Sequence, residues 1–153
     1  MDLNLKGQRV LVTGGSRGIG LAIAQAFAAE GAMPIIASRD AEQLALAVKA
    51  IHSRTGISAE SVATDLSQPG ATEALFKAVG EIDVLVNNAG AIPGGSLHDL
   101  DEQRWRQAWE LKLFSYINLT RSYLPMMEQR GRGVICNIIG LAGVAPRYDY
   151  ICG

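Results

Sequence analysis

Several features that mark particular classes of protein are scarce or missing in this sequence. Only two of its 153 residues are cysteines, Cys136 and Cys152, and their spacing suits neither a disulfide framework nor a metal site. We interpret both as buried apolar residues and expect no metal and a reducing, cytoplasmic compartment. No uncharged stretch approaches the roughly 18 residues of a membrane-spanning helix, and residues 1–7 lack the apolar core of a signal peptide. We therefore expect no membrane partner.

An excess of charge of one sign is also missing. Lys and Arg number 14 against 15 Asp and Glu, which gives a net charge of −1, and no basic cluster suits a nucleic-acid backbone. A hydrophobic content of 48% with 19% charged residues is that of a soluble globular protein. The length allows one well-buried core, so we predict a single domain over residues 1–153.

Short apolar runs alternate with amphipathic stretches along the chain. This alternation is typical of a parallel β-sheet covered by helices. It predicts strands over residues 9–12, 34–37, 61–64, 84–86 and 134–138, and helices over residues 18–30, 41–53, 70–79 and 101–121. Trp105, Trp109 and Leu113 recur at intervals of four and predict a buried stripe on the last helix. The predicted fold class is α/β, a doubly wound parallel sheet in three layers with about five strands.

A glycine-bearing motif lies between the first predicted strand and the first predicted helix. It reads Thr13-Gly14-Gly15-Ser16-Arg17-Gly18-Ile19-Gly20. Glycine permits a sharp turn and a close approach of the backbone to a ligand, and N–H groups at a helix N-terminus can receive a pyrophosphate. Any tight turn from strand to helix favours glycine, so this motif alone is a weak indication. A second motif, Asn87-Asn88-Ala89-Gly90 after the fourth predicted strand, makes a dinucleotide site the better interpretation.

The two motifs, in this order and spacing, resemble the short-chain dehydrogenase/reductase family, whose patterns are T-G-x-x-x-G-x-G and N-N-A-G. The resemblance runs from about Lys6 to the last residue and includes Asp65, Leu124-Pro125 at the end of the long helix, and Asn137-Ile138 on the fifth strand. It implies a Rossmann-like fold, hydride transfer between a nicotinamide cofactor and a small-molecule carbonyl or alcohol, and a homo-oligomer, either dimer or tetramer.

The same resemblance implies roles for residues outside the glycine motif. Asp65 would bind the adenine amino group, and residues 88–90 would line the adenosine ribose. The cofactor-binding residues that we predict are Gly14, Ser16, Arg17, Gly18, Ile19, Gly20, Ser38, Arg39, Asp65, Asn88, Ala89 and Gly90.

The end of the second predicted strand bears on which cofactor is preferred. Where the unphosphorylated cofactor is favoured, a carboxylate at this position bonds the ribose hydroxyls and repels a 2′-phosphate. Here the position is Ser38, followed by Arg39, and Arg17 lies in the glycine motif. Two guanidinium groups could pair with phosphate oxygens, which favours NADP over NAD. Two alternatives stay open: Arg39 is a solvated strand-end residue, or Asp40 faces the ribose instead of capping the next helix together with Gln43.

The catalytic positions depart from the family pattern. By the resemblance, carbonyl reductases use a Tyr as proton donor, a Lys four residues later, a Ser that polarises the carbonyl, and an Asn on the long helix. Tyr150 fits the proton donor better than Tyr148, because residues 151–153 resemble the small residues that follow it in the family. The Ser position holds Gly140 and the Asn position holds Lys112. The Lys position falls one residue past the chain's end, so the resemblance implies that the C-terminal part of the family fold is lacking.

Two functions stay open. The first is an NADP-dependent oxidoreductase of this family with Tyr150 as acid and base. The second is a nucleotide-binding, catalytically inactive regulatory or binding protein of the same fold, which Gly140 and Lys112 favour. We favour the first for the complete polypeptide and expect the 153-residue chain by itself to show no carbonyl reductase activity.

Overall fold

The computed structural model describes residues 3–153, so Met1 and Asp2 of the N-terminal segment lie outside the described residues. One parallel sheet holds five strands in the order β3-β2-β1-β4-β5. They are β1 (Arg9–Thr13), β2 (Met33–Ser38), β3 (Glu60–Ala63), β4 (Val84–Asn87) and β5 (Val134–Asn137). The chain runs outward from β1 to β3 and then returns to add β4 on the other side of β1. This reversal defines a doubly wound sheet and confirms the predicted fold class.

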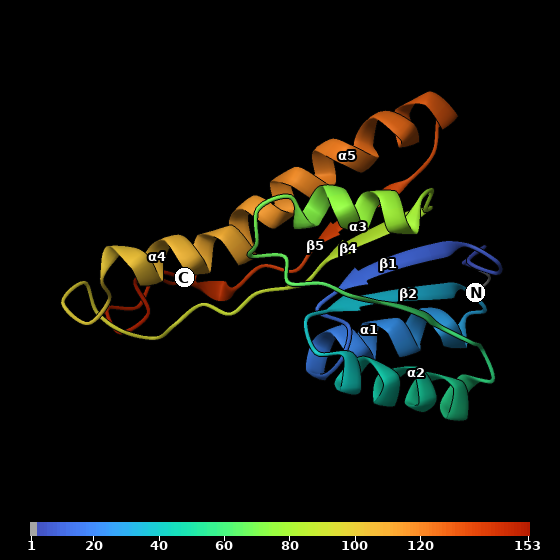
Figure 1. The fold of residues 1–153 in the computed structure, drawn as a ribbon, viewed down its shortest axis with the longest axis horizontal. Coiled ribbons are helices and arrows are strands. Elements are labelled where there is room, and N and C mark those ends of the chain that lie inside the picture. The colour runs from blue at the N-terminus through green and yellow to red at the C-terminus, as the bar shows by residue number, and fades with distance from the viewer. Residues whose placement is uncertain (1–2) are drawn as a thin grey trace.

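Helices cover both faces of the sheet. Helices α1 (Gly18–Ala29) and α2 (Ala41–Thr55) lie on one face, and α3 (Ala71–Val79) and α5 (Ser115–Arg130) lie on the other (Figure 1). The side chains of the central strand β1 point alternately to the two faces of the sheet, so β1 packs against the helices on both faces. Val10 and Val12 pack with α1 and α2 on one face of the sheet. Leu11 packs with Leu119 and Tyr123 of α5 on the opposite face. All three β1 residues are fully buried, as expected for a strand covered on both sides.

The long helix differs from the sequence-based prediction. It consists of α4 (Glu102–Trp109), a π-helical turn η1 (Glu110–Phe114) and α5, which continues to Arg130. The prediction that it ends at Leu124-Pro125 is wrong, since Pro125 lies inside α5. Proline removes one backbone donor, but Tyr123 and Met127 on either side of it are buried in the core and hold the helix there. The helix ends instead at Gly131, whose φ of 67° is the left-handed conformation typical of a C-terminal cap.

The predicted buried stripe on this helix is also wrong. Trp109 is 41% exposed and Leu113 is 42% exposed. Helix α4 projects past the carboxyl edge of the sheet, where no second layer covers it (Figure 1). Only Trp105 is half-buried, against a small cluster that includes Cys152. The buried stripe lies further along, in α5, where Tyr116 begins a row of buried residues on the sheet side.

Smaller predictions have mixed outcomes. The Oδ1 atom of Asp40 accepts the N–H of Gln43 at 3.0 Å, which confirms the N-cap of α2. Cys152 is buried, as predicted, but Cys136 is only half-buried because β5 is an edge strand. In the part of the chain that the structure describes, no helix has the length and apolarity to cross a membrane.

Candidate functional site

A cleft of about 1140 Å³ runs along the carboxyl edge of the sheet. It brings together residues from the loops after all five strands and from the long helix. Every predicted cofactor-binding and catalytic residue lines it except Gly18. Ligands of doubly wound sheets bind at this edge, beside the strand where the order reverses.

The glycine motif forms the tight turn between β1 and α1. Gly14 has a φ of +66° and Gly18 a φ of +55°, so both adopt the left-handed conformation that favours glycine. Gly20 is needed for a different reason. A Cβ atom at that position would collide with the carbonyl oxygen of Gly14, because the first turn of α1 packs directly on the end of β1.

The N-terminus of α1 faces the cleft without a protein cap. Within the described residues, no side chain caps it and no acidic residue lies in its first turn. The N-cap residue is Arg17, whose exposed side chain lines the cleft. Unbonded N–H groups and the positive end of the helix dipole together favour an anion. The turn therefore fits a pyrophosphate group.

Thr13 joins this turn to the second motif. Its buried hydroxyl oxygen accepts the backbone N–H groups of Asn88 and Ala89, each at 3.0 Å. The side-chain amide of Asn88 donates back to the carbonyl oxygens of Thr13 at 2.9 Å and Gly14 at 3.3 Å. These bonds hold the loop after β4 against the turn after β1, which fixes the floor of the cleft.

The end of β2 carries no carboxylate. The Ser16 hydroxyl donates to the Ser38 hydroxyl across 3.0 Å, and Arg39 lies exposed beside them at the mouth of the cleft. Asp40 is engaged as the cap of α2. On the outer side lies Asp65, whose pKa is held below its ordinary value mainly by hydrogen bonds from the Ser67 hydroxyl and N–H, with a smaller contribution from the charge of Arg39.

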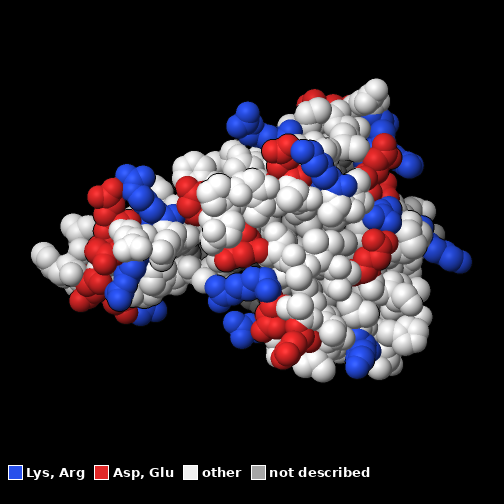
Figure 2. Space-filling model, viewed as in Figure 1, with Lys and Arg blue, Asp and Glu red and all other residues white. Residues whose placement is uncertain are grey.

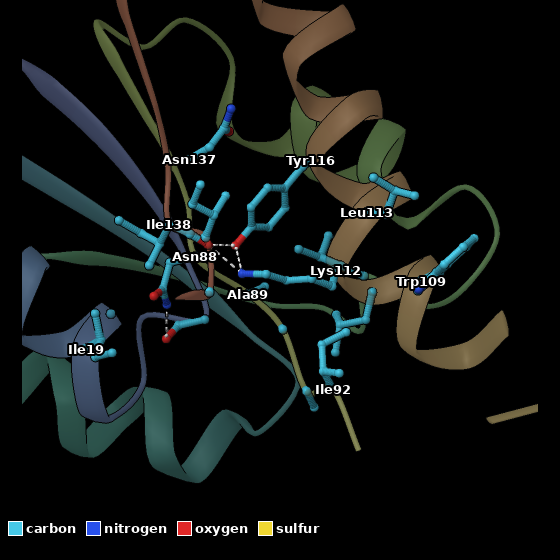
Figure 3. A pocket seen from close by; sticks show the side chains of 18 of the residues that line it. Ile19, Asn88, Ala89, Ile92, Trp109, Lys112, Leu113, Tyr116, Asn137 and Ile138 are labelled. Carbon is cyan, nitrogen blue, oxygen red and sulfur yellow. Dashed lines mark hydrogen bonds between the residues drawn. The ribbon is translucent and has the colours of Figure 1, made fainter. Parts of the chain in front are cut away.

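Lys112 lies in the π-helical turn and reaches into the cleft. Its Nζ donates to the phenol oxygen of Tyr116 and to the carbonyl oxygen of Ile138, each at 2.6 Å (Figure 3). Its stem crosses Gly90, where a Cβ atom would come within 2.5 Å of Lys112 Cδ. Burial lowers the pKa of Lys112 and raises that of Tyr116 well above its ordinary value.

The other two predicted catalytic positions lie near the end of the chain. Gly140 has extended backbone, with φ −81° and ψ 160°, and begins the short 3-10 turn η2 (Leu141–Gly143). Tyr150 is half-buried in the cleft wall, held by strand-like pairing of its segment with Gly95. Tyr148 is 73% exposed and does not line the cleft.

Sequence reasoning missed three contributors to the site. The first is the Thr13 hydroxyl, which was visible as part of the glycine motif but carries no ligand-binding signature. The second is Tyr116, whose position four residues after Lys112 on a helix is a usable signal. The third is the Ile138 carbonyl group, which only the tertiary structure brings to Lys112.

The charged side chains that line the cleft are mainly basic. On the face drawn in Figure 2, acidic and basic side chains are interspersed. Of the side chains that line the cleft, the basic ones are Arg17, Arg39, Lys112 and Arg121, whereas the one acidic side chain is Asp65. The lining is therefore suited to a ligand with several negative charges.

Comparison with known proteins agrees with this geometry. The family described as short chain dehydrogenase matches residues 8–152. The chain belongs to that family.

Individual relatives are similar over nearly the whole chain. Uncharacterized oxidoreductase YvrD of Bacillus subtilis (strain 168) is 35% identical over 149 residues, which cover 95% of this chain and 56% of that protein. The 3-oxoacyl-[acyl-carrier-protein] reductase FabG of Vibrio cholerae is 35% identical over 97% of this chain and 62% of its own length. The solved L-sorbose reductase from Gluconobacter frateurii, complexed with NADPH and L-sorbose, is 32% identical with a TM-score of 0.90, over 99% of this chain and 60% of that one. The chain thus spans little more than half the length of these relatives.

Proposed function

We propose that the chain forms the dinucleotide-binding part of an NADP-dependent oxidoreductase that moves a hydride between nicotinamide and a small-molecule carbonyl or alcohol. Relatives over nearly the whole chain are named as oxidoreductases and reductases, and several solved ones contain NADP or NADPH. The observation that carries the proposal is the uncapped N-terminus of α1, which opens into a cleft lined by Arg17 and Arg39.

Different residues of the chain would bind different parts of the cofactor. Backbone N–H groups of residues 16–20 would receive the pyrophosphate, with the Arg17 side chain beside them. Ser38 and Arg39 would hold the 2′-phosphate, since no carboxylate at the end of β2 repels it. Asp65 would accept the adenine amino group, and residues 88–90 would line the adenosine ribose.

Three positions concern the reaction itself. The bound cofactor would supply or accept the hydride. Tyr150 would exchange the proton with the substrate oxygen, because its phenol is held in the cleft wall. Gly140 offers no hydroxyl to polarise the carbonyl, whereas the Lys112 ammonium donates to the carbonyl oxygen of Ile138, two residues before Gly140.

Calorimetric titration tests the proposal. NADPH should bind more tightly than NADH by about ten- to a hundred-fold, because one charge-assisted phosphate contact contributes about 1.5–3 kcal/mol. Arg39→Ala should remove most of this difference. Arg54→Ala is the control, since Arg54 is exposed on α2, donates to Gln25 and does not line the cleft. Equal affinity for both cofactors in the unmodified chain would refute the NADP preference.

A second function has support from two residues. Gly140 and Lys112 differ from the side chains that the family resemblance implies for catalysis, which favours a nucleotide-binding protein without turnover. Tight NADPH binding, with no reaction of any carbonyl substrate in the longest natural polypeptide that carries this chain, would favour this alternative.

The remaining proposals concern assembly and compartment. We propose a homo-oligomer, dimer or tetramer, because Trp109, Leu113 and Ile117 expose apolar surface on one helix. We propose a cytoplasmic compartment, since both cysteines are free.

A further inference from the structure

The two ends of the cleft differ in how their charges are arranged. Arg39, which is exposed, and Asp65, which is half-buried, follow β2 and β3 on one side of the crossover. Lys112 lies over β4 and β5 on the other side. A dinucleotide in a doubly wound sheet bridges the crossover, with the ribose of its adenosine half at the end of β2. Its nicotinamide half would therefore lie on the side of Lys112.

The ammonium group of Lys112 has no compensating negative charge among the described residues. It forms no ion pair there, and it donates to a phenol oxygen and a carbonyl oxygen, both neutral. An ammonium has three N–H donors, so one remains for a ligand. Of the basic residues that line the cleft, Lys112 alone is half-buried, while Arg17, Arg39 and Arg121 are exposed and screened by solvent.

The position of this cation is constrained on several sides. The stem lies against Gly90, the head bonds Ile138 across 26 residues of sequence, and the backbone is a π-helical turn. Such turns are rare and occur frequently at functional sites. The ammonium is therefore a fixed charge at one end of the cleft and not a mobile surface group.

We propose that Lys112 makes the cleft select the reduced form of the cofactor. The oxidised nicotinamide ring carries a positive charge and the reduced ring is neutral, whereas the phosphates of the two forms are identical. A fixed, partly desolvated ammonium beside the ring therefore raises the free energy of bound NADP⁺ and leaves that of NADPH nearly unchanged. This inference rests on the proposed NADP site and adds a specificity-determining residue to it.

The expected effect follows from Coulomb's law. Two unit charges roughly 10 Å apart, at an effective dielectric constant of about 20, change an equilibrium constant by about tenfold. NADPH should therefore bind about tenfold more tightly than NADP⁺. For a two-electron couple, that ratio makes the midpoint potential of the bound cofactor about 30 mV more positive.

Calorimetry on the full 153-residue chain tests this without any turnover. The dissociation constants of NADPH and NADP⁺ are measured at neutral pH for the unmodified chain and for Lys112→Met and Lys112→Gln. Both variants should bring the ratio of the two constants close to one, mainly by tightening NADP⁺. Lys77→Met is the matched control, because Lys77 is exposed on α3 and paired with Glu73.

Each outcome is decisive. A ratio near one in the unmodified chain overturns the inference even if every variant fails to fold. A ratio that persists in folded Lys112→Met, verified by circular dichroism, also overturns it and leaves the proposed cofactor site intact. Failure of both cofactor forms to bind would overturn the proposed function and this inference together.

Discussion

The hydroxyl of Ser16 donates a hydrogen bond to the hydroxyl of Ser38, with 3.0 Å between the two oxygens. The bond links the glycine turn after β1 to the end of β2. The acceptor at position 38 is a neutral hydroxyl, where a carboxylate would favour the unphosphorylated cofactor. The neutral Ser16–Ser38 pair thus joins the two segments and leaves the site without a charge that would repel a 2′-phosphate.

Ser38→Asp should reverse the cofactor preference. The new carboxylate would repel the 2′-phosphate and accept hydrogen bonds from free ribose hydroxyls, so NADPH affinity should fall by about ten- to a hundred-fold while NADH affinity rises. Parallel calorimetric titrations measure both changes. Ser53→Asp, an exposed position on α2, adds the same charge away from the cleft and should alter neither affinity. If Ser38→Asp kept the preference for NADPH over NADH, the 2′-phosphate of the bound cofactor would not lie beside residue 38.

Gly20→Ala should destabilise the fold and weaken cofactor binding. Alanine is the better helix former by about 1 kcal/mol, but its Cβ would collide with the Gly14 carbonyl oxygen, which as a backbone atom cannot move aside cheaply. Overpacking of this kind typically lowers the free energy of unfolding by about 1–3 kcal/mol. Denaturant unfolding measures the loss. Gly143→Ala is the control, since its Cβ would meet no atom within 4 Å; equal stability of both variants would show that the packing at Gly20 is looser than described.

Gly140→Ser should be tolerated and should supply the missing hydroxyl. The nearest atom to a Cβ at this position is the Ala142 nitrogen at 4.0 Å, and the backbone is extended, so the free energy of unfolding should change by no more than about 0.5 kcal/mol. A single donor to a developing oxyanion contributes about a hundred- to a thousand-fold in rate. We therefore expect no measurable NADPH oxidation by the unmodified chain with ketones, aldehydes or 3-oxoacyl thioesters. Any turnover gained in Gly140→Ser should vanish when Tyr150→Phe is added, and turnover by the unmodified chain that depends on Tyr150 would contradict this prediction.

The chain should self-associate through the apolar surface of the long helix. Trp109, Leu113, Phe114 and Ile117 are each 41–43% exposed along η1 and its two flanks. Light scattering should report a dimer or larger species at concentrations on the order of tens of micromolar. Leu113→Glu should shift the mass toward the monomer, whereas Leu46→Glu, at an exposed leucine on α2, should not. A monomer in the unmodified chain would argue against this surface as an interface.

The amino-acid sequence by itself determined the fold class and the turn between β1 and α1. Val10, Leu11 and Val12 identify a strand covered on both sides, and the glycines that follow permit the left-handed backbone of a sharp turn into a helix. The cap at Asp40 was equally readable. These features depend on backbone sterics and on hydrogen bonds between near neighbours in the chain, and such interactions act wherever the segment lies.

Only the tertiary structure decided which side chains share the cleft and which lie in solvent. The Ile138 carbonyl oxygen holds the Lys112 ammonium in the cleft, and the pairing with Gly95 holds Tyr150 in the cleft wall. Helix α5 continues through Pro125 because Tyr123 and Met127 are buried. The spacing of Trp105, Trp109 and Leu113 predicted a buried stripe, yet two of them are exposed where α4 projects past the sheet. The spacing of apolar residues indicates that a helix has an apolar side. Whether the sheet or another helix covers that side depends on contacts between residues far apart in the sequence.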